Sequence, residues 1–280
     1  MNMNGFLKMV GTHVKAELRT NVLGAAVFDL IITPLFILAV GKWVDRTVIE
    51  ELATTIGSYM IMSMTAGLAA LIIIQLSSEM MMERSSGVLL RARSLPHGPL
   101  VWSIGKSISV AIIVLMMQVV VLVGGLIFFT WTQMSAGTIL LVIVVMVLSL
   151  AAHAPIGLIV GSISRGVYSN VIVVLGVLAV FATSGIAFPI DILPRWIQVI
   201  QMALPTFWSG HLVRSVILPA ESGAAEVMGS FQPALAVSVL AVWTVVGFVV
   251  AAFLVKRFFR HESIGAMQKM QASLRSQLGA

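Results

Sequence analysis

Six long apolar runs separated by short polar segments set the hydrophobic pattern of this chain. The runs cover residues 22–41, 57–76, 107–129, 138–160, 167–188 and 234–255. Each run holds roughly 20 residues, and at ~1.5 Å per residue a helix of that length spans the ~30 Å hydrocarbon core of a bilayer. Barrel strands would instead alternate apolar and polar positions over about 10 residues. The pattern predicts an all-α polytopic membrane protein with six transmembrane helices in residues 22–256.

Basic charge is concentrated in every second segment between the runs. The 17 lysines and arginines lie before the first run or after the second, fourth and sixth runs, with the exception of Lys42, Arg46, Arg195 and Arg214. Loops on the cytoplasmic side of a membrane collect lysine and arginine. The asymmetry therefore predicts a multi-pass protein of the cell (cytoplasmic) membrane with both termini in the cytoplasm.

Composition agrees with a membrane protein and excludes several other classes. Hydrophobic residues make up 59% of the chain and charged residues 10%, against about 25% charged residues in soluble domains. A cytoplasmic surface that faces anionic lipid explains the net charge of +6, so we expect membrane lipids as partners and no nucleic acid. The chain has no cysteine, which excludes a disulfide framework and thiol chemistry.

Two basic segments flank the predicted membrane domain. In residues 1–21, the apolar side chains fall within about 120° of a helical wheel, opposite Lys8, Lys15 and Arg19. This pattern predicts an amphipathic interface helix on the cytoplasmic leaflet, with a frayed basic terminus as the alternative. Residues 257–280 are predicted to form a basic cytoplasmic tail.

The segment between the second and third runs is too polar to cross the membrane. Residues about 79–98 mix methionine and leucine with charged side chains, namely Glu79, Glu83, Arg84, Arg91 and Arg93. We expect a short cytoplasmic helix that ends at Pro96 and Pro99. An amphipathic helix between two spans is a docking surface for a partner, the alternative being a solvated charged face.

Prolines divide the segment that follows the fifth run. Pro189, Pro194 and Pro205 each disfavour a continuous helix, so residues about 189–208 are predicted to form a hairpin around a short helix. That helix is too short to span the membrane and too apolar to leave it, and Trp196 favours an interfacial position. We expect an external re-entrant hairpin, with a surface helix that merely anchors the loop as the alternative.

Few ionisable groups lie within the apolar runs, and no catalytic motif is complete. Asp29 is expected to face the bundle, either as a structural polar group or with a role in transport. His153 is expected to be a hydrogen-bonded bundle residue. Gly105-Lys106 looks like the end of a Walker A loop, but Leu100 stands where that motif needs glycine. We expect no catalytic residue, no metal site and no cofactor bound by this chain.

Two segments carry a resemblance to a known family. The first resembles the coupling-helix region of the permeases of type-2 ABC exporters, through Glu83-Arg84, Gly87, Leu95-Pro96 and Gly105-Lys106. The second resembles that family's signature around the fifth span, through Ser184-Gly185, Phe188-Pro189, Leu193-Pro194, Trp196, Pro205 and Arg214. Here Leu204-Pro205 replaces the usual Asn-Pro. In length and pattern the chain is similar to the daunorubicin-resistance permeases of drug exporters.

The resemblance implies a transport subunit that is not itself an enzyme. It implies a homodimer or heterodimer of permeases, on which two copies of a separate ABC ATPase subunit dock and use ATP and Mg. The residues that would couple to the ATPase are Glu83, Arg84, Gly87 and Arg91. The residues that would form the gate and pathway are Asp29, Phe188, Pro189, Ile192 and Trp196.

The expected function is ATP-driven export of a hydrophobic or amphipathic substrate, such as a drug or a lipid-like molecule, because mostly apolar spans suit such cargo. Permeases of the same fold also export glycans, which keeps that substrate class open. The alternatives are an ion-coupled secondary transporter, a membrane-embedded enzyme and a non-transport scaffold. ATP hydrolysis that depends on this chain separates the first hypothesis from these three.

Overall fold

The computed structural model describes residues 3–23, 26–49, 54–95, 97–129, 131, 134–164, 166–261, 265, 268 and 271–272. Helices dominate this part of the chain, which confirms the all-α class predicted from the apolar runs. The α-helices are α1 (Met3–Leu23), α2 (Ala26–Val44), α3 (Ile56–Gly67), α4 (Leu71–Ser85), α5 (Val88–Ser94), α6 (Gly98–Phe128), α7 (Ala136–Ile163), α8 (Val167–Thr183), α9 (Arg195–Ala203), α10 (Pro205–Ile217) and α11 (Pro233–His261). Short 3-10 helices are η2 (Leu68–Ala70), η3 (Ile190–Ile192) and η4 (Ala220–Ala225), and strands β1 (Val48–Ile49) and β2 (Thr54–Thr55) pair antiparallel.

Four helical segments of the described residues are long and apolar enough to cross a membrane. They are the continuous stretch from α3 through η2 to α4 (Ile56–Ser85), α6, α7 and α11. Two shorter apolar helices are α8, with 17 residues, and the Leu30–Val44 part of α2. A helix of that length measures ~25 Å, so it crosses a bilayer only where the bilayer thins locally. The protein is a multi-pass membrane protein, and its predicted total of six spans stays a prediction.

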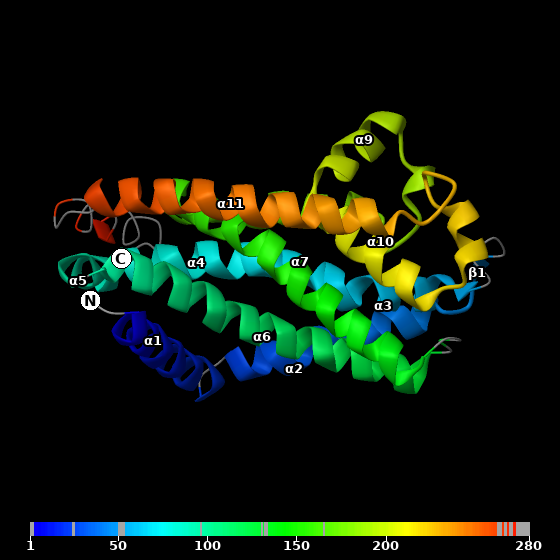
Figure 1. Ribbon diagram of the computed structural model, residues 1–280, viewed down its shortest axis with the longest axis horizontal. Helices are drawn as coiled ribbons and strands as arrows, with labels where there is room; N and C mark the ends of the chain where they lie inside the picture. The colour runs from blue at the N-terminus through cyan, green and yellow to red at the C-terminus, as the bar shows by residue number, and fades with distance from the viewer. Residues whose placement is uncertain are drawn as a thin grey trace.

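The long helices run side by side along the length of the molecule (Figure 1). The start of α1, the short helix α5 and the last turns of α11 lie at one end, which we call the α5 end. Helix α9 and strand β1 lie at the opposite end, the α9 end. The predicted coupling segment and the predicted hairpin therefore lie at opposite ends of the bundle. That the α5 end faces the cytoplasm stays a prediction.

Small residues bring α4 and α7 into close contact. A Cβ atom at Gly157 of α7 would lie 3.1 Å from the backbone oxygen of Ile72, and one at Gly161 would lie 2.9 Å from the sulfur of Met80. Helices within a bilayer gain little from the hydrophobic effect, so close packing through small residues holds them together. The Gln118 side chain adds a polar link, since its Nε2 donates to the carbonyl of Ala66 at 3.0 Å.

Large apolar side chains cover the outside of α2, α8 and α11. Phe36 is 66% exposed, Ile172 70% and Val249 68%. A soluble monomer rarely exposes continuous apolar faces of this kind. Lipid or a second membrane subunit is the expected neighbour of these faces.

Helix boundaries differ from the sequence-based expectation at three places. Helix α4 runs on to Ser85, so Glu79 and Glu83 belong to the span and not to a separate coupling helix. Helix α6 begins at Gly98, with Pro99 in its first turn, where proline is tolerated because the first N–H groups have no helical partner. Helix α8 ends at Thr183, before the fifth apolar run does. Pro96 lies outside the described residues.

Candidate functional site

A glycine forms the turn between α4 and α5. Helix α4 ends at Ser85, Gly87 has a φ of +77°, and α5 begins at Val88. A residue with a side chain takes this left-handed backbone at a cost of about 1–2 kcal/mol, whereas glycine takes it freely. Gly87 therefore sets the direction in which α5 leaves α4.

Glu83 points from the last turns of α4 toward α6. One oxygen of its carboxylate accepts the indole N–H of Trp102, and the other pairs with the Nζ atom of Lys106. Trp102 and Lys106 are four residues apart on α6, about one helical turn, so both face α4. These contacts leave only 14% of the Glu83 side chain exposed. They hold the end of α4 against α6.

Lys106 forms ion pairs with carboxylates of two neighbouring helices. Its Nζ atom lies 2.6 Å from Oε2 of Glu17 on α1 and 3.0 Å from Oε2 of Glu79 on α4, in addition to its contact with Glu83. Only 2% of the lysine side chain is exposed. Among the described residues these three carboxylates are close enough together to bind a metal ion. The ammonium group contacts all three, so it occupies the place that a cation would take.

Arg84 also points into the protein. It is 6% exposed, its Nη1 donates to the carbonyl of Ser164 at 2.6 Å, and its guanidinium lies 4.2 Å from the ring centre of Phe258. Ser164 follows α7 and Phe258 belongs to α11. Arg84 therefore links the end of α4 to two other helices at the α5 end.

Arg91 on α5 is exposed beside an apolar groove of about 300 Å³. The groove lies between α1 and α5 and reaches the start of α6. Its lining includes Met9, His13, Val88, Leu95 and Trp102. An exposed cation next to an apolar groove gives this end of the molecule a surface suited to protein docking.

The structure therefore separates the four predicted coupling residues. Arg91 is exposed and Gly87 forms the turn, whereas Glu83 and Arg84 face inward. The predicted separate helix over residues about 79–98 is corrected for Glu83 and Arg84, because both belong to α4 and their charged groups contact α6, α11 and the residue after α7. A role of all four in ATPase coupling stays a prediction.

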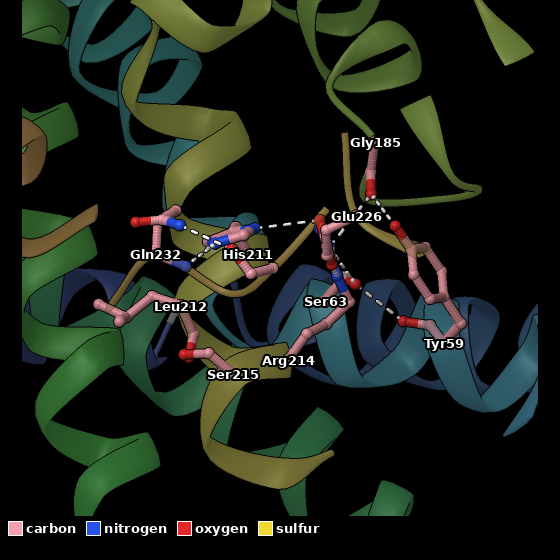
Figure 2. A network of polar contacts seen from close by, with 10 residues as sticks. Tyr59, Ser63, Gly185, His211, Leu212, Arg214, Ser215, Glu226 and Gln232 are labelled. Atoms are coloured by element: carbon pink, nitrogen blue, oxygen red, sulfur yellow. Dashed lines mark hydrogen bonds and ion pairs between the residues drawn. The ribbon is translucent and has the colours of Figure 1, made fainter. Parts of the chain in front are cut away.

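A second polar network is buried at the α9 end (Figure 2). The Nε and Nη2 atoms of Arg214 on α10 donate to the two carboxylate oxygens of Glu226 at 2.6 and 3.0 Å. Its Nη1 donates to Oγ of Ser63 at 3.0 Å and to the carbonyl of Gly185 at 3.2 Å. The same carbonyl accepts the hydroxyl of Tyr59 at 2.9 Å. The network joins α3, the turn after α8, α10 and the segment after η4.

His211 completes this network in a defined tautomer. The backbone N–H of Gln232 donates to its Nε2 at 3.0 Å, so Nδ1 carries the proton and donates to Glu226, also at 3.0 Å. Burial alone would raise the pKa of Glu226. The charge of Arg214 and the hydrogen bonds from His211 and Arg214 outweigh burial and lower the pKa to about 2. Glu226 is therefore ionised at neutral pH.

The hairpin begins directly after this network. Gly185 has a φ of +76°, so the chain turns away from the axis of α8 at this residue. The short helices η3 and α9 follow. Helix α9 turns its glutamines inward, since Gln198 donates to the carbonyl of Leu193 at 2.8 Å and Gln201 donates to Oγ1 of Thr183 at 2.6 Å. Its apolar side faces outward, with Trp196 66% exposed.

The predicted gate residues divide between the two sides of this hairpin. Phe188 and Pro189 are half-buried at its start. Ile192 is 68% and Trp196 66% exposed at its apolar outer side. Asp29 belongs to α2, but its side chain lies outside the described residues. Four of the five predicted pathway residues thus lie close together in the sequence and in the structure, and their role as a gate stays a prediction.

His153 has the bundle role expected of it. Its Nδ1 donates to the carbonyl of Ser149 at 2.7 Å, and its Nε2 accepts the hydroxyl of Thr206 at 3.1 Å. The first bond lies within α7, and the second joins α7 to α10. The residue is fully buried.

Sequence analysis missed the partners of Lys106 and of Arg214. Glu17 and Lys106 are 89 residues apart, and Ser63 and Arg214 are 151 apart. Local periodicity carries no information on such distant pairs. The available signal was the rarity of charge itself, since a lysine or arginine in an otherwise apolar helix needs a buried carboxylate.

Comparison with known protein families gives a match. The family model described as ABC-2 type transporter matches residues 13–218, which is most of the chain. The matched residues include the α4–α5 turn, the Lys106 cluster and the hairpin with α10. A search of curated proteins finds no match.

Proposed function

The chain belongs to the ABC-2 type transporter family, and from that premise we propose that it drives export across the cell membrane with energy from a separate ABC ATPase subunit. A membrane subunit of this family transports, and it pairs with an ABC ATPase. The observation that carries the proposal is the arrangement along the bundle. The short helix α5, which exposes Arg91, lies at one end, and the hairpin, which exposes Ile192 and Trp196, lies at the other.

ATPase docking is proposed on α5. Arg91 offers a charge on an exposed face, and the apolar groove beside it would receive a hydrophobic side chain of the ATPase. ATP must bind the closed ATPase pair more tightly than the open pair, and the docked helix passes this difference in free energy to the spans. Gly87 would fix the angle of α5, while Glu83 and Arg84 would tie its base to the bundle.

Two copies of this chain, or this chain and a related one, are proposed to enclose the pathway. The exposed apolar faces of α2 and α8 would take part in that contact or face lipid. At the α9 end, Phe188, Ile192 and Trp196 of the two hairpins would close the exit by packing and by excluding water. A surface helix that only anchors the loop remains the competing account of α9.

The substrate is proposed to be hydrophobic or amphipathic, a drug or a lipid-like molecule. The spans are largely apolar on the outside as well as in the core, so such a substrate would enter from the bilayer without crossing a polar barrier. Resistance to antibiotics would follow if the cargo is a drug. Export of a glycan by the same fold is the second candidate.

Reconstitution tests this proposal. The chain is purified with the ATPase that accompanies it and placed in liposomes, and three cargoes are compared, namely rhodamine 6G, a fluorescent phospholipid and a lipid-linked glycan. We expect ATP hydrolysis that requires the chain, and ATP-dependent movement of rhodamine 6G or the phospholipid. Movement of the glycan alone would favour the second candidate. Movement that follows an ion gradient without ATP would favour a secondary transporter and contradict the proposal.

A further inference from the structure

A lysine buried in a transmembrane helix needs a reason, and Lys106 has three carboxylates around it. It is 2% exposed, on a helix whose other side chains are mostly apolar. Removing ions from water costs several kcal/mol each, so ion pairs of this kind contribute little net stability compared with apolar packing. Stability alone therefore gives no reason for placing four charged groups here.

The position of the cluster suggests what it does. Glu83 lies four residues before Gly87, the turn from which α5 leaves. Its carboxylate is held by Trp102 and Lys106 of α6, one helical turn apart. Any rotation of the end of α4 therefore pulls on α6 at two points.

The third helix in the cluster is α1. Glu17 is the α1 residue that reaches Lys106, at 2.6 Å. Nearby, a Cβ atom at Gly105 would lie 2.4 Å from the ring of His13, so α1 and α6 touch directly. The exposed side of α1 carries Lys8 and Lys15. One ammonium group thus links the end of α4, the start of α6 and the helix along the surface of the bundle.

We propose that Lys106 is a positioning residue for energy coupling, which holds α1, α4 and α6 as one unit so that motion of α5 reaches the spans. This inference rests on the proposed function. Lys106 contacts neither substrate nor nucleotide in this account and acts through Glu83 and Glu17. Without its charge, α5 would move with the ATPase while α6 stayed behind.

The first test measures how much transport each hydrolysed ATP produces. The full chain with its ATPase partner in liposomes is compared with Lys106→Met and with Glu83→Gln, which keeps the size of the side chain. Lys42→Met is the matched control, because Lys42 pairs with Asp45 at 3.0 Å but is 60% exposed. Rates of ATP hydrolysis and of rhodamine 6G transport are measured in the same vesicles.

We expect the number of rhodamine 6G molecules moved per ATP to fall at least tenfold in Lys106→Met and Glu83→Gln. The control should keep the ratio of the unsubstituted protein. An ion pair that only stabilises the fold would lower both rates together and leave the ratio unchanged. An unchanged ratio in both variants overturns the proposal.

A second test needs neither transport nor the ATPase. Nitroxide labels are placed at Thr12→Cys on α1 and Ser94→Cys on α5, two exposed positions in a chain without native cysteine. Pulsed electron paramagnetic resonance in nanodiscs should give one narrow distance distribution, which Glu17→Gln and Lys106→Met broaden. A distribution that both variants leave unchanged contradicts the positioning role.

The two tests also separate this inference from the proposed function. If the unsubstituted protein moves no rhodamine 6G, the proposed substrate class fails. The number of rhodamine 6G molecules moved per ATP then cannot be measured. The label distances then decide the role of Lys106 by themselves.

Discussion

At the scale of single residues, buried charges at the two ends of the bundle hold distant helices together. Arg214 is 1% exposed, and its guanidinium donates two parallel hydrogen bonds to the carboxylate of Glu226. Planar pairs of this kind are the strongest that arginine makes. Removing one partner leaves the other charge buried and unpaired, which costs about 3–5 kcal/mol.

The pH dependence of folding tests this pair. The pKa of Glu226 is lowered from 4.5 to about 2, so its contribution is fully present above pH 4.5 and is lost as the pH falls toward 2. The shift corresponds to about 3 kcal/mol. We measure the midpoint of thermal unfolding in detergent at pH 5 and at pH 3. We expect the midpoint to fall less between these pH values in Glu226→Gln than in the unsubstituted protein. The control is Glu221→Gln, an exposed carboxylate in η4. Equal acid sensitivity of Glu226→Gln and the unsubstituted protein contradicts the assignment.

Packing of α4 on α7 gives a second prediction at this scale. Gly157→Leu would force side-chain atoms into the backbone of Ile72, and overpacking of this kind costs about 1–3 kcal/mol. The control is Gly176→Leu on α8, where a Cβ atom meets nothing within 4 Å. The midpoint temperature of thermal unfolding should fall clearly for Gly157→Leu and little for Gly176→Leu. Equal midpoints would show that α4 and α7 are not in close contact.

At the scale of elements, the turn at Gly87 decides where α5 points. A side chain at φ +77° is strained whatever space surrounds it, so the backbone relaxes and α5 shifts. Gly87→Ala should therefore lower transport about tenfold. The variant should still insert into the membrane and should elute as a single species in detergent. The control is Gly11→Ala on α1, where nothing lies within 4 Å of the new Cβ atom. Normal transport by Gly87→Ala would mean that the angle of α5 does not matter.

Sequence pattern located the elements better than their ends. The apolar runs predicted the helices because lipid and core both select apolar side chains over the whole length of a span. The end of α4 was placed too early because Glu79 and Glu83 look solvent-exposed until Lys106 is known to face them. Pro189, Pro194 and Pro205 correctly marked the breaks before η3, α9 and α10, since the effect of proline on the backbone is local.

The candidate site was predictable only in part for the same reason. Gly87 and the hairpin residues are local signals, and the structure places Gly87 at a turn. Arg84 contacts Phe258 of α11 and Ser164 after α7, and Lys106 contacts Glu17 of α1, all far away in the chain. Their inward direction depends on packing that no periodicity in the sequence records.

At the scale of the whole molecule, the account assigns the two ends to opposite sides of the membrane. Ser86 at the α5 end and Val48 at the α9 end are both exposed, and the chain has no cysteine of its own. In intact cells, a membrane-impermeant maleimide should label Val48→Cys and leave Ser86→Cys unlabelled. The positive control for Ser86→Cys is labelling after the membrane is opened. External labelling of Ser86→Cys in intact cells would contradict this topology.

In the proposed mechanism, ATP binding by a partner docked at the α5 end changes the conformation of the α9 end. A crosslink across two copies of the hairpin measures this change most directly. Phe188→Cys is introduced into the complex of the chain with its ATPase, and disulfide formation between copies is followed with and without trapped ATP. The account predicts strong crosslinking without nucleotide, weak crosslinking in the ATP-trapped state, and loss of export once the crosslink has formed. Crosslinking that is absent, or that is the same in both states, would contradict the account.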